Sequence, residues 1–161
     1  MKTKLYLKFF GLLIVTAILQ VIFPSISIKS ILLKPDLFLL FLTYIALRYG
    51  RFSSVLFGFC LGFIQDITTQ IELLGAFSFI KSITGYLLGS IFDYERIWSK
   101  QIRWLVIVGI YFVHFSIYYF IQLNGSLTTF LVGTMLVSIH ATINLAFLFL
   151  MNKFIFNSKL V

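Results

Sequence analysis

The sequence predicts an all-α integral membrane protein, a bundle of about six transmembrane helices. Hydrophobic residues make up 60% of its 161 residues and charged residues only 11%, whereas a soluble domain uses about 25% charged residues to cover its surface. The mean hydropathy of +1.04 also favours a lipid environment. We therefore expect one transmembrane domain over residues 1–161 and no soluble domain.

Six apolar segments follow one another along the chain. They run from about Leu5 to Phe23, Asp36 to Leu47, Phe52 to Ile67, Leu73 to Phe92, Trp104 to Gln122 and Phe130 to Met151. The last segment covers roughly 33 Å at 1.5 Å per residue, enough to cross the bilayer. The second covers only about 18 Å, so it needs shelter from its neighbours or a thinned bilayer.

The first two segments begin with recognisable signals. Lys2, Lys4 and Lys8 precede the first apolar run, which is longer than the core of a usual signal peptide, so we interpret it as a retained helix. Pro35 and Asp36 open the second segment. Proline has no backbone N–H to lose in a first turn, and a carboxylate favours the positive end of a helix. A structural role is therefore favoured over catalysis.

The third and fourth segments carry small residues four positions apart. Gly58 and Gly62 lie in the third segment, and Gly85 and Gly89, preceded by Ser82, lie in the fourth. This spacing places them on one helix face, where another backbone can approach closely. Two interpretations stay open. The face packs against another helix of this chain, which we favour, or it forms a groove for the helix of a partner.

Lys81 is an unexpected residue because it lies about 12 Å inside the fourth segment. A charge at that depth should face the protein interior and have a partner. Asp66, at the end of the neighbouring third segment, is the nearest carboxylate in sequence, so we predict a Lys81–Asp66 ion pair with Gln65 as a further hydrogen-bond partner. An ion or ligand site is one interpretation. A structural clamp, or a lysine that reaches an interface, is favoured because one pair makes neither a relay nor a pore.

The last two segments carry polar stripes, which we expect to face one another inside the bundle. The stripe of the fifth segment consists of Tyr111, His114, Tyr118 and Gln122, and that of the sixth of Thr134, Ser138 and Thr142. His140 and Asn144 of the sixth segment lie four apart on one face of their own. Histidines in such helices more often hydrogen-bond than bind a metal. The single cysteine, Cys60, builds no disulfide or metal cluster alone. No phosphate loop, nucleophile elbow or zinc motif is present, so we expect no catalytic residue, no cofactor, no metal and no enzyme.

Basic residues distinguish the two sides of the membrane. With the N-terminus in the cytoplasm, the inner segments hold Lys2, Lys4, Lys8, Arg48, Arg51, Arg96, Lys100, Arg103, Lys153 and Lys159. The outer loops hold only Lys29 and Lys34. The positive-inside rule then places both termini in the cytoplasm. The net charge of +8 reflects this topology, and we expect no nucleic-acid partner because no long basic stretch exists.

The stretch from Lys34 to Gly89 resembles the MreD family, small membrane proteins of the bacterial rod-shape system. The resemblance rests on Lys34-Pro35-Asp36-Leu37, the run from Tyr44 to Gly50, Gly58-Phe59, Gly62, Asp66, Leu74-Gly75, and the run from Gly85 to Gly89. It implies that Pro35, Asp36, Asp66, Gly75 and the four spaced glycines shape the bundle. Lys81 matches no signature of the family.

The resemblance implies a function and partners. MreD-like proteins accompany MreC, a single-span protein with a periplasmic domain, in the elongation complex that builds lateral peptidoglycan with MreB, RodA, RodZ and a class B penicillin-binding protein. Their fold is similar to the S subunit of energy-coupling-factor vitamin transporters. We therefore predict a non-enzymatic, multi-pass scaffold for MreC in the lipid of the bacterial cytoplasmic membrane. The alternative is a substrate-binding subunit of a vitamin-type transporter, with Lys81 and Asp66 lining a pocket.

Overall fold

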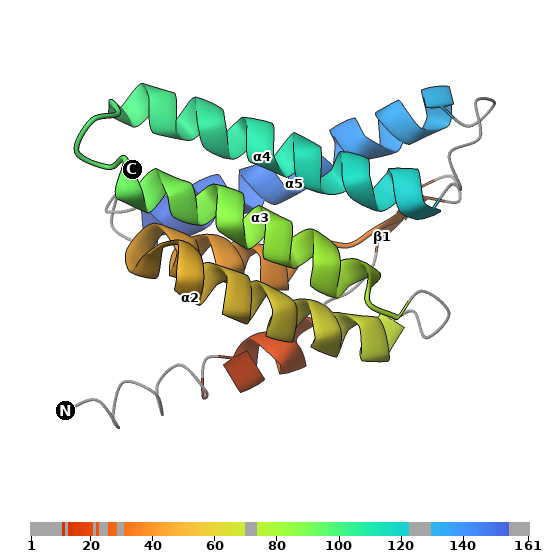
Figure 1. The fold of residues 1–161 in the computed structure, drawn as a ribbon. Helices are drawn as coiled ribbons and strands as arrows, with labels where there is room; N and C mark the ends of the chain where they lie inside the picture. The colour runs from red at the N-terminus through yellow and green to blue at the C-terminus, as the bar shows by residue number, and fades with distance from the viewer. Residues whose placement is uncertain are drawn as a thin grey trace.

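A computed structural model describes residues 11, 13–20, 22, 26–28, 31–69, 74–122 and 130–154. After helical residues 13–20, its elements are β1 (Ile26–Ile28), β2 (Ile31–Leu33), α2 (Leu37–Thr69), α3 (Ala76–Asp93), α4 (Lys100–Gln122) and α5 (Phe130–Phe154). The helices lie lengthwise beside one another (Figure 1). The two strands pair antiparallel at one end of the bundle, where only a loop was expected.

Three of the described helices are long and apolar enough to cross a membrane. They are residues 37–69 in α2, 100–122 in α4 and 130–153 in α5. Their outer surfaces carry large apolar side chains: Leu105 is 74% exposed and Leu131 is 81% exposed. Faces of this kind mark contact with lipid or another protein. The predicted class of a helical membrane protein is confirmed, whereas the number of six spans stays a prediction.

Gly50 turns the chain back on itself within α2. Its φ of 77° and ψ of −171° are not helical and lie where side chains are rarely tolerated. Leu61, after this turn, packs in one apolar cluster with four residues before it: Phe38, Phe41, Leu42 and Ile45. The two halves of α2, residues 37–49 and 51–69, therefore run antiparallel. They correspond to the predicted second and third segments, drawn in orange and gold in Figure 1.

The other helix boundaries lie close to the predicted ones. α4 begins at Lys100, one turn before the predicted Trp104, because its polar first turn gave no apolar signal. Ser99 caps that turn, since its backbone oxygen accepts from the Arg103 amide at 3.1 Å. Of the predicted first segment, residues 5–23, only residues 11, 13–20 and 22 belong to the described part, and they are helical.

The apolar core lies between the first half of α2 and the three later helices. Leu39 of α2 belongs to one cluster with Leu88 of α3, Ile107 of α4 and Ala141 of α5, all of them buried. The first half of α2 is therefore the central element of the bundle. The start of α2 therefore lies within contact distance of α3, α4 and α5.

Basic side chains gather at the end of the bundle opposite to the strands. The Arg51 Nε atom lies 2.6 Å from Asp93 Oδ2, which joins the Gly50 turn to the end of α3. The ring centroids of Trp104 and Phe149 lie 6.4 Å apart, which brings the last turns of α5 to the start of α4. Basic residues at this end include Arg48, Arg51, Arg96, Lys100, Arg103 and Lys153.

Candidate functional site

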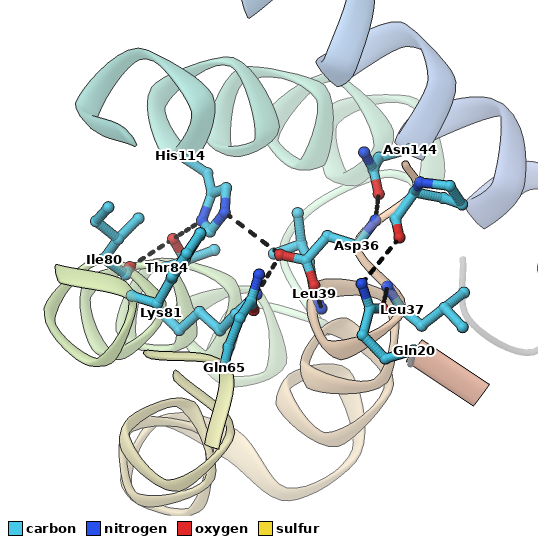
Figure 2. A network of polar contacts seen from close by, with 12 residues as sticks. Gln20, Asp36, Leu37, Leu39, Gln65, Ile80, Lys81, Thr84, His114 and Asn144 are labelled. Atoms are coloured by element: carbon cyan, nitrogen blue, oxygen red, sulfur yellow. Dashed lines mark hydrogen bonds and ion pairs between the residues drawn. The ribbon is translucent and has the colours of Figure 1, made fainter. Parts of the chain in front are cut away.

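Asp36 lies at the centre of a buried polar network (Figure 2). It directly precedes α2 and caps it, since its Oδ1 atom accepts from the Leu39 amide at 3.0 Å. Its own amide donates to Asn144 Oδ1 of α5 at 2.8 Å. Its Oδ2 atom forms an ion pair with Lys81 of α3 and lies 4.0 Å from His114 Nε2 of α4. One carboxylate residue thus joins four helices.

Lys81 is fully buried, and its ammonium contacts the Asp36 carboxylate. The predicted ion pair of Lys81 with Asp66 is therefore wrong, because the partner of Lys81 is Asp36. A helical side chain leans toward the N-terminus of its own helix, and this direction brings the Lys81 ammonium to the start of α2. The choice of the carboxylate nearest in sequence missed Asp36, which is separated from Lys81 by 45 positions.

Asp66 has a different task, which explains why it does not pair with Lys81. Its Oδ1 atom accepts from the Phe77 amide at 2.9 Å, and its Oδ2 atom accepts from the Ser78 amide at 3.0 Å. The Ser78 hydroxyl donates to the same Oδ2 at 2.7 Å. The first amides of a helix need acceptors, and Gly75 before α3 has no side chain to supply one. Asp66 of α2 therefore caps α3.

Further polar contacts extend the network to the remaining elements. The Gln20 side chain accepts from the Leu37 amide at 2.7 Å and donates to the Pro35 carbonyl at 3.4 Å, which ties helical residues 13–20 to the start of α2. On the other side, His114 Nδ1 lies 2.8 Å from the Thr84 hydroxyl, joining α4 to α3. Gln20 and Thr84 were not predicted as site residues, although a polar side chain in an apolar segment signals such a role.

Of the predicted polar stripe of α4, Tyr111 and His114 are buried, Tyr118 is half-buried and Gln122 is exposed. Tyr111 bonds to the Thr43 hydroxyl at 2.8 Å, and the Tyr119 hydroxyl lies 2.9 Å from His140 Nδ1. On α5, His140 and Asn144 are buried. The residues on its exposed face are Thr134, Ser138 and Thr142. The expectation that this second stripe faces α4 is wrong, because His140 and Asn144 define the inner face of α5.

The spaced glycines lie where α3 meets the second half of α2. A Cβ atom at Gly58 would overlap the backbone carbonyl of Lys81, and one at Gly85 would overlap that of Ser54. Gly62 lies against the backbone of Phe77, and Gly89 lies against the backbone of Arg51, in the same contact between α2 and α3. Ser82 follows Lys81 on α3, and its hydroxyl donates to the Ser78 carbonyl at 2.7 Å. These residues serve packing within the chain, so they leave no groove for a partner helix at this place.

The polar contacts of the network join the helices to one another. Lys81 pairs with Asp36, and Asp66 accepts from the first amides of α3, so each charge has its own partner within the chain. Among the described residues, no group of three histidine, cysteine or acidic side chains could hold a metal ion. Pro35 and Asp36 lie directly before α2, and Gly75 lies directly before α3. Asp66, near the end of α2, caps the start of α3.

Comparisons with known proteins give one family. The model of rod shape-determining protein MreD matches residues 1–157. No curated protein and no solved structure matches the chain.

Proposed function

Because this chain belongs to the MreD family of rod shape-determining proteins, we propose that it is a non-enzymatic scaffold for an MreC-like partner. The match over residues 1–157 of 161 carries the proposal, since it spans nearly the whole chain. Through that partner the chain joins MreB, RodA, RodZ and a class B penicillin-binding protein in lateral peptidoglycan synthesis. Helices able to cross a membrane suit this role, because MreC also spans the bilayer.

The proposal includes a position in the cytoplasmic membrane with six spans and both termini inside. The basic end of the bundle supports this orientation, because lysine and arginine collect on the cytoplasmic side. α5 ends beside the start of α4 at that end. The Gly50 turn supports the count, because it makes two spans of α2. A likeness to the S subunit of vitamin transporters stays a prediction of the resemblance.

The mechanism we propose is lateral packing of helices in lipid. The Asp36 network fixes the four helices relative to one another, so the bundle offers a rigid outer surface. The partner's span packs on that surface and takes its depth and tilt from it. Helices pack well in membranes where small side chains let backbones come close.

The exposed face of α5 is our proposed contact for the partner's span. The hydroxyls of Ser138 and Thr142 donate to backbone carbonyls of their own helix at 2.8 Å and 2.7 Å. These side chains are small, and their hydroxyls already have acceptors within their own helix. A second helix can therefore approach this face closely. Thr134 continues this face one turn earlier and donates to the Leu131 carbonyl at 2.9 Å.

Cysteine cross-linking in membranes tests this contact. In a Cys60→Ser background, Ser138→Cys should form a disulfide with single cysteines placed along the MreC-like span. Native Cys60, which is exposed on the second half of α2, is the matched control and should form none. Co-purification of the two proteins is measured in parallel. Co-purification with cross-links at Cys60 only would move the contact to α2, and failure to co-purify would contradict the scaffold function.

The structure gives no support to the alternative of a vitamin-type transport subunit. That alternative rested on the implied likeness to the S subunit and on Lys81 with Asp66 lining a pocket. Lys81 instead pairs with Asp36, and Asp66 caps α3. Native mass spectrometry of the purified chain separates the two functions, because a vitamin binder retains a stoichiometric small molecule.

A further inference from the structure

Two buried polar groups with unused hydrogen-bonding capacity lie on facing helices, the Lys81 ammonium on α3 and the Gln65 side-chain oxygen on α2. We propose that they form an internal binding site for one water molecule, held between Gln65 Oε1 of α2 and Lys81 Nζ of α3. The site is independent of the proposed scaffold function. It concerns the hydrogen bonds of buried polar groups, whereas the scaffold function concerns what the outer surface binds.

The first group, the Lys81 ammonium, is only partly satisfied. It has three N–H donors, its side chain is 0% exposed, and one donor goes to the Asp36 carboxylate. The Phe77 ring, with its centroid 5.9 Å from Nζ, adds a weak attraction but no acceptor atom. Two donors therefore have no acceptor within the described residues. Leaving the donors of a buried ammonium without acceptors is costly.

The second unsatisfied group is the side-chain oxygen of Gln65. The residue is 6% exposed, and its Oε1 atom has no hydrogen-bond partner among the residues that the structure describes. An amide oxygen accepts up to two hydrogen bonds. A buried acceptor and buried donors of this kind are the groups that internal water satisfies.

The helix packing directs the two side chains toward each other. Gly58 lies against Lys81 and Gly62 against Phe77, so the second half of α2 runs antiparallel to α3. Gln65 follows Gly62 by about one turn and lies near the start of α3. Side chains lean toward the N-termini of their helices, so Gln65 and Lys81 approach from opposite directions. Figure 2 shows the Gln65 side chain pointing toward the Asp36–Lys81 pair.

The chemistry of the two groups selects water as the ligand. The Gln65 oxygen only accepts and the Lys81 ammonium only donates, so the bridging molecule has to do both. A metal cation would meet the ammonium, and an anion would meet the amide oxygen and the Asp36 carboxylate. Water donates to Gln65, accepts from Lys81 and keeps one more donor for Asp36 Oδ2, which gives it the two to four partners that buried water has.

Solid-state NMR of the full labelled chain in lipid vesicles tests the site. Magnetisation is transferred from water protons to the Lys81 ¹⁵Nζ signal, with exposed Lys100 as the positive control. We expect transfer to Lys81 at short mixing times, and a clear loss of that transfer in Gln65→Met. Wild-type protein that shows transfer to Lys100 but none to Lys81 overturns the proposal without any variant.

Thermal unfolding of Gln65→Met gives a second, signed readout. If water bridges the two groups, the substitution removes the acceptor of that water and leaves donors around Lys81 without a partner. The unfolding midpoint then falls by roughly 2–8 °C. If the oxygen is simply unsatisfied, removing it raises the midpoint, and that result contradicts the site. Gln101→Met, at an exposed position of α4, is the matched control and should leave the midpoint unchanged.

Discussion

At the scale of single residues, the two buried carboxylates have separate structural roles. Asp36 neutralises Lys81 and caps α2, whereas Asp66 caps α3 from outside that helix. A buried charge is tolerated only with a partner and with its remaining hydrogen-bonding groups satisfied. Each residue should therefore respond differently to substitution, and the difference tests the assignment.

Lys81→Met should destabilise the bundle by about 3–5 kcal/mol, because it leaves the Asp36 carboxylate buried without a counter-charge. Asp36→Asn added to Lys81→Met should restore part of that loss, whereas Asp66→Asn should restore none. Denaturant unfolding in detergent measures the three variants, with Lys100→Met at an exposed site as control. Rescue by Asp66→Asn alone would show that the ion pair is assigned to the wrong carboxylate.

Asp66→Ala should loosen the start of α3 at a cost of about 1–3 kcal/mol, because it removes the acceptors of two buried amides. Hydrogen exchange at Phe77 and Ser78 should become faster, while the end of α3 keeps its protection. Phe79→Leu, at an exposed position of the same helix, is the control. Unchanged exchange at both amides would contradict the capping role.

At the scale of elements, α3 and the second half of α2 pack backbone against backbone. Gly50 reverses the chain so that these helices can meet, and the glycines of both let their backbones touch. Spacing along the sequence predicted this face, because a spacing of four is a local property of any helix.

Gly85→Leu should prevent folding or strongly reduce the yield of folded protein, since the new side chain would overlap the Ser54 carbonyl. Gly109→Leu is the matched control on α4, where an added Cβ meets nothing within 4 Å. Size-exclusion chromatography in detergent separates folded from aggregated protein. Equal elution of both variants as folded protein would refute the close contact.

At the scale of the whole molecule, local signals in the sequence predicted more than long-range ones. Helix segments and the glycine face follow from composition and spacing. The partner of Lys81 did not follow, because Asp36 is distant in sequence and only the antiparallel fold brings it near. The inner face of α5 was also undetermined, since Ser138 and His140 both lie on polar stripes and periodicity alone does not say which one points inward.

The distribution of charge over the molecule predicts its orientation. In a Cys60→Ser background, Ser99→Cys at the basic end should react with a membrane-impermeant maleimide only after the cells are opened. Leu74→Cys, exposed at the opposite end, should react in intact cells. The reverse pattern would invert the topology that the positive-inside rule gives.

The central claim is that this chain acts in rod-shape determination through an MreC-like partner and not through chemistry. Depletion of the chain in its own host, followed by re-expression, measures this claim directly by cell shape. We predict that depleted cells lose rod shape and stop retaining the MreC-like protein with the elongation complex, and that re-expression restores both. Cells that keep their rod shape and an intact complex after complete depletion would contradict the account.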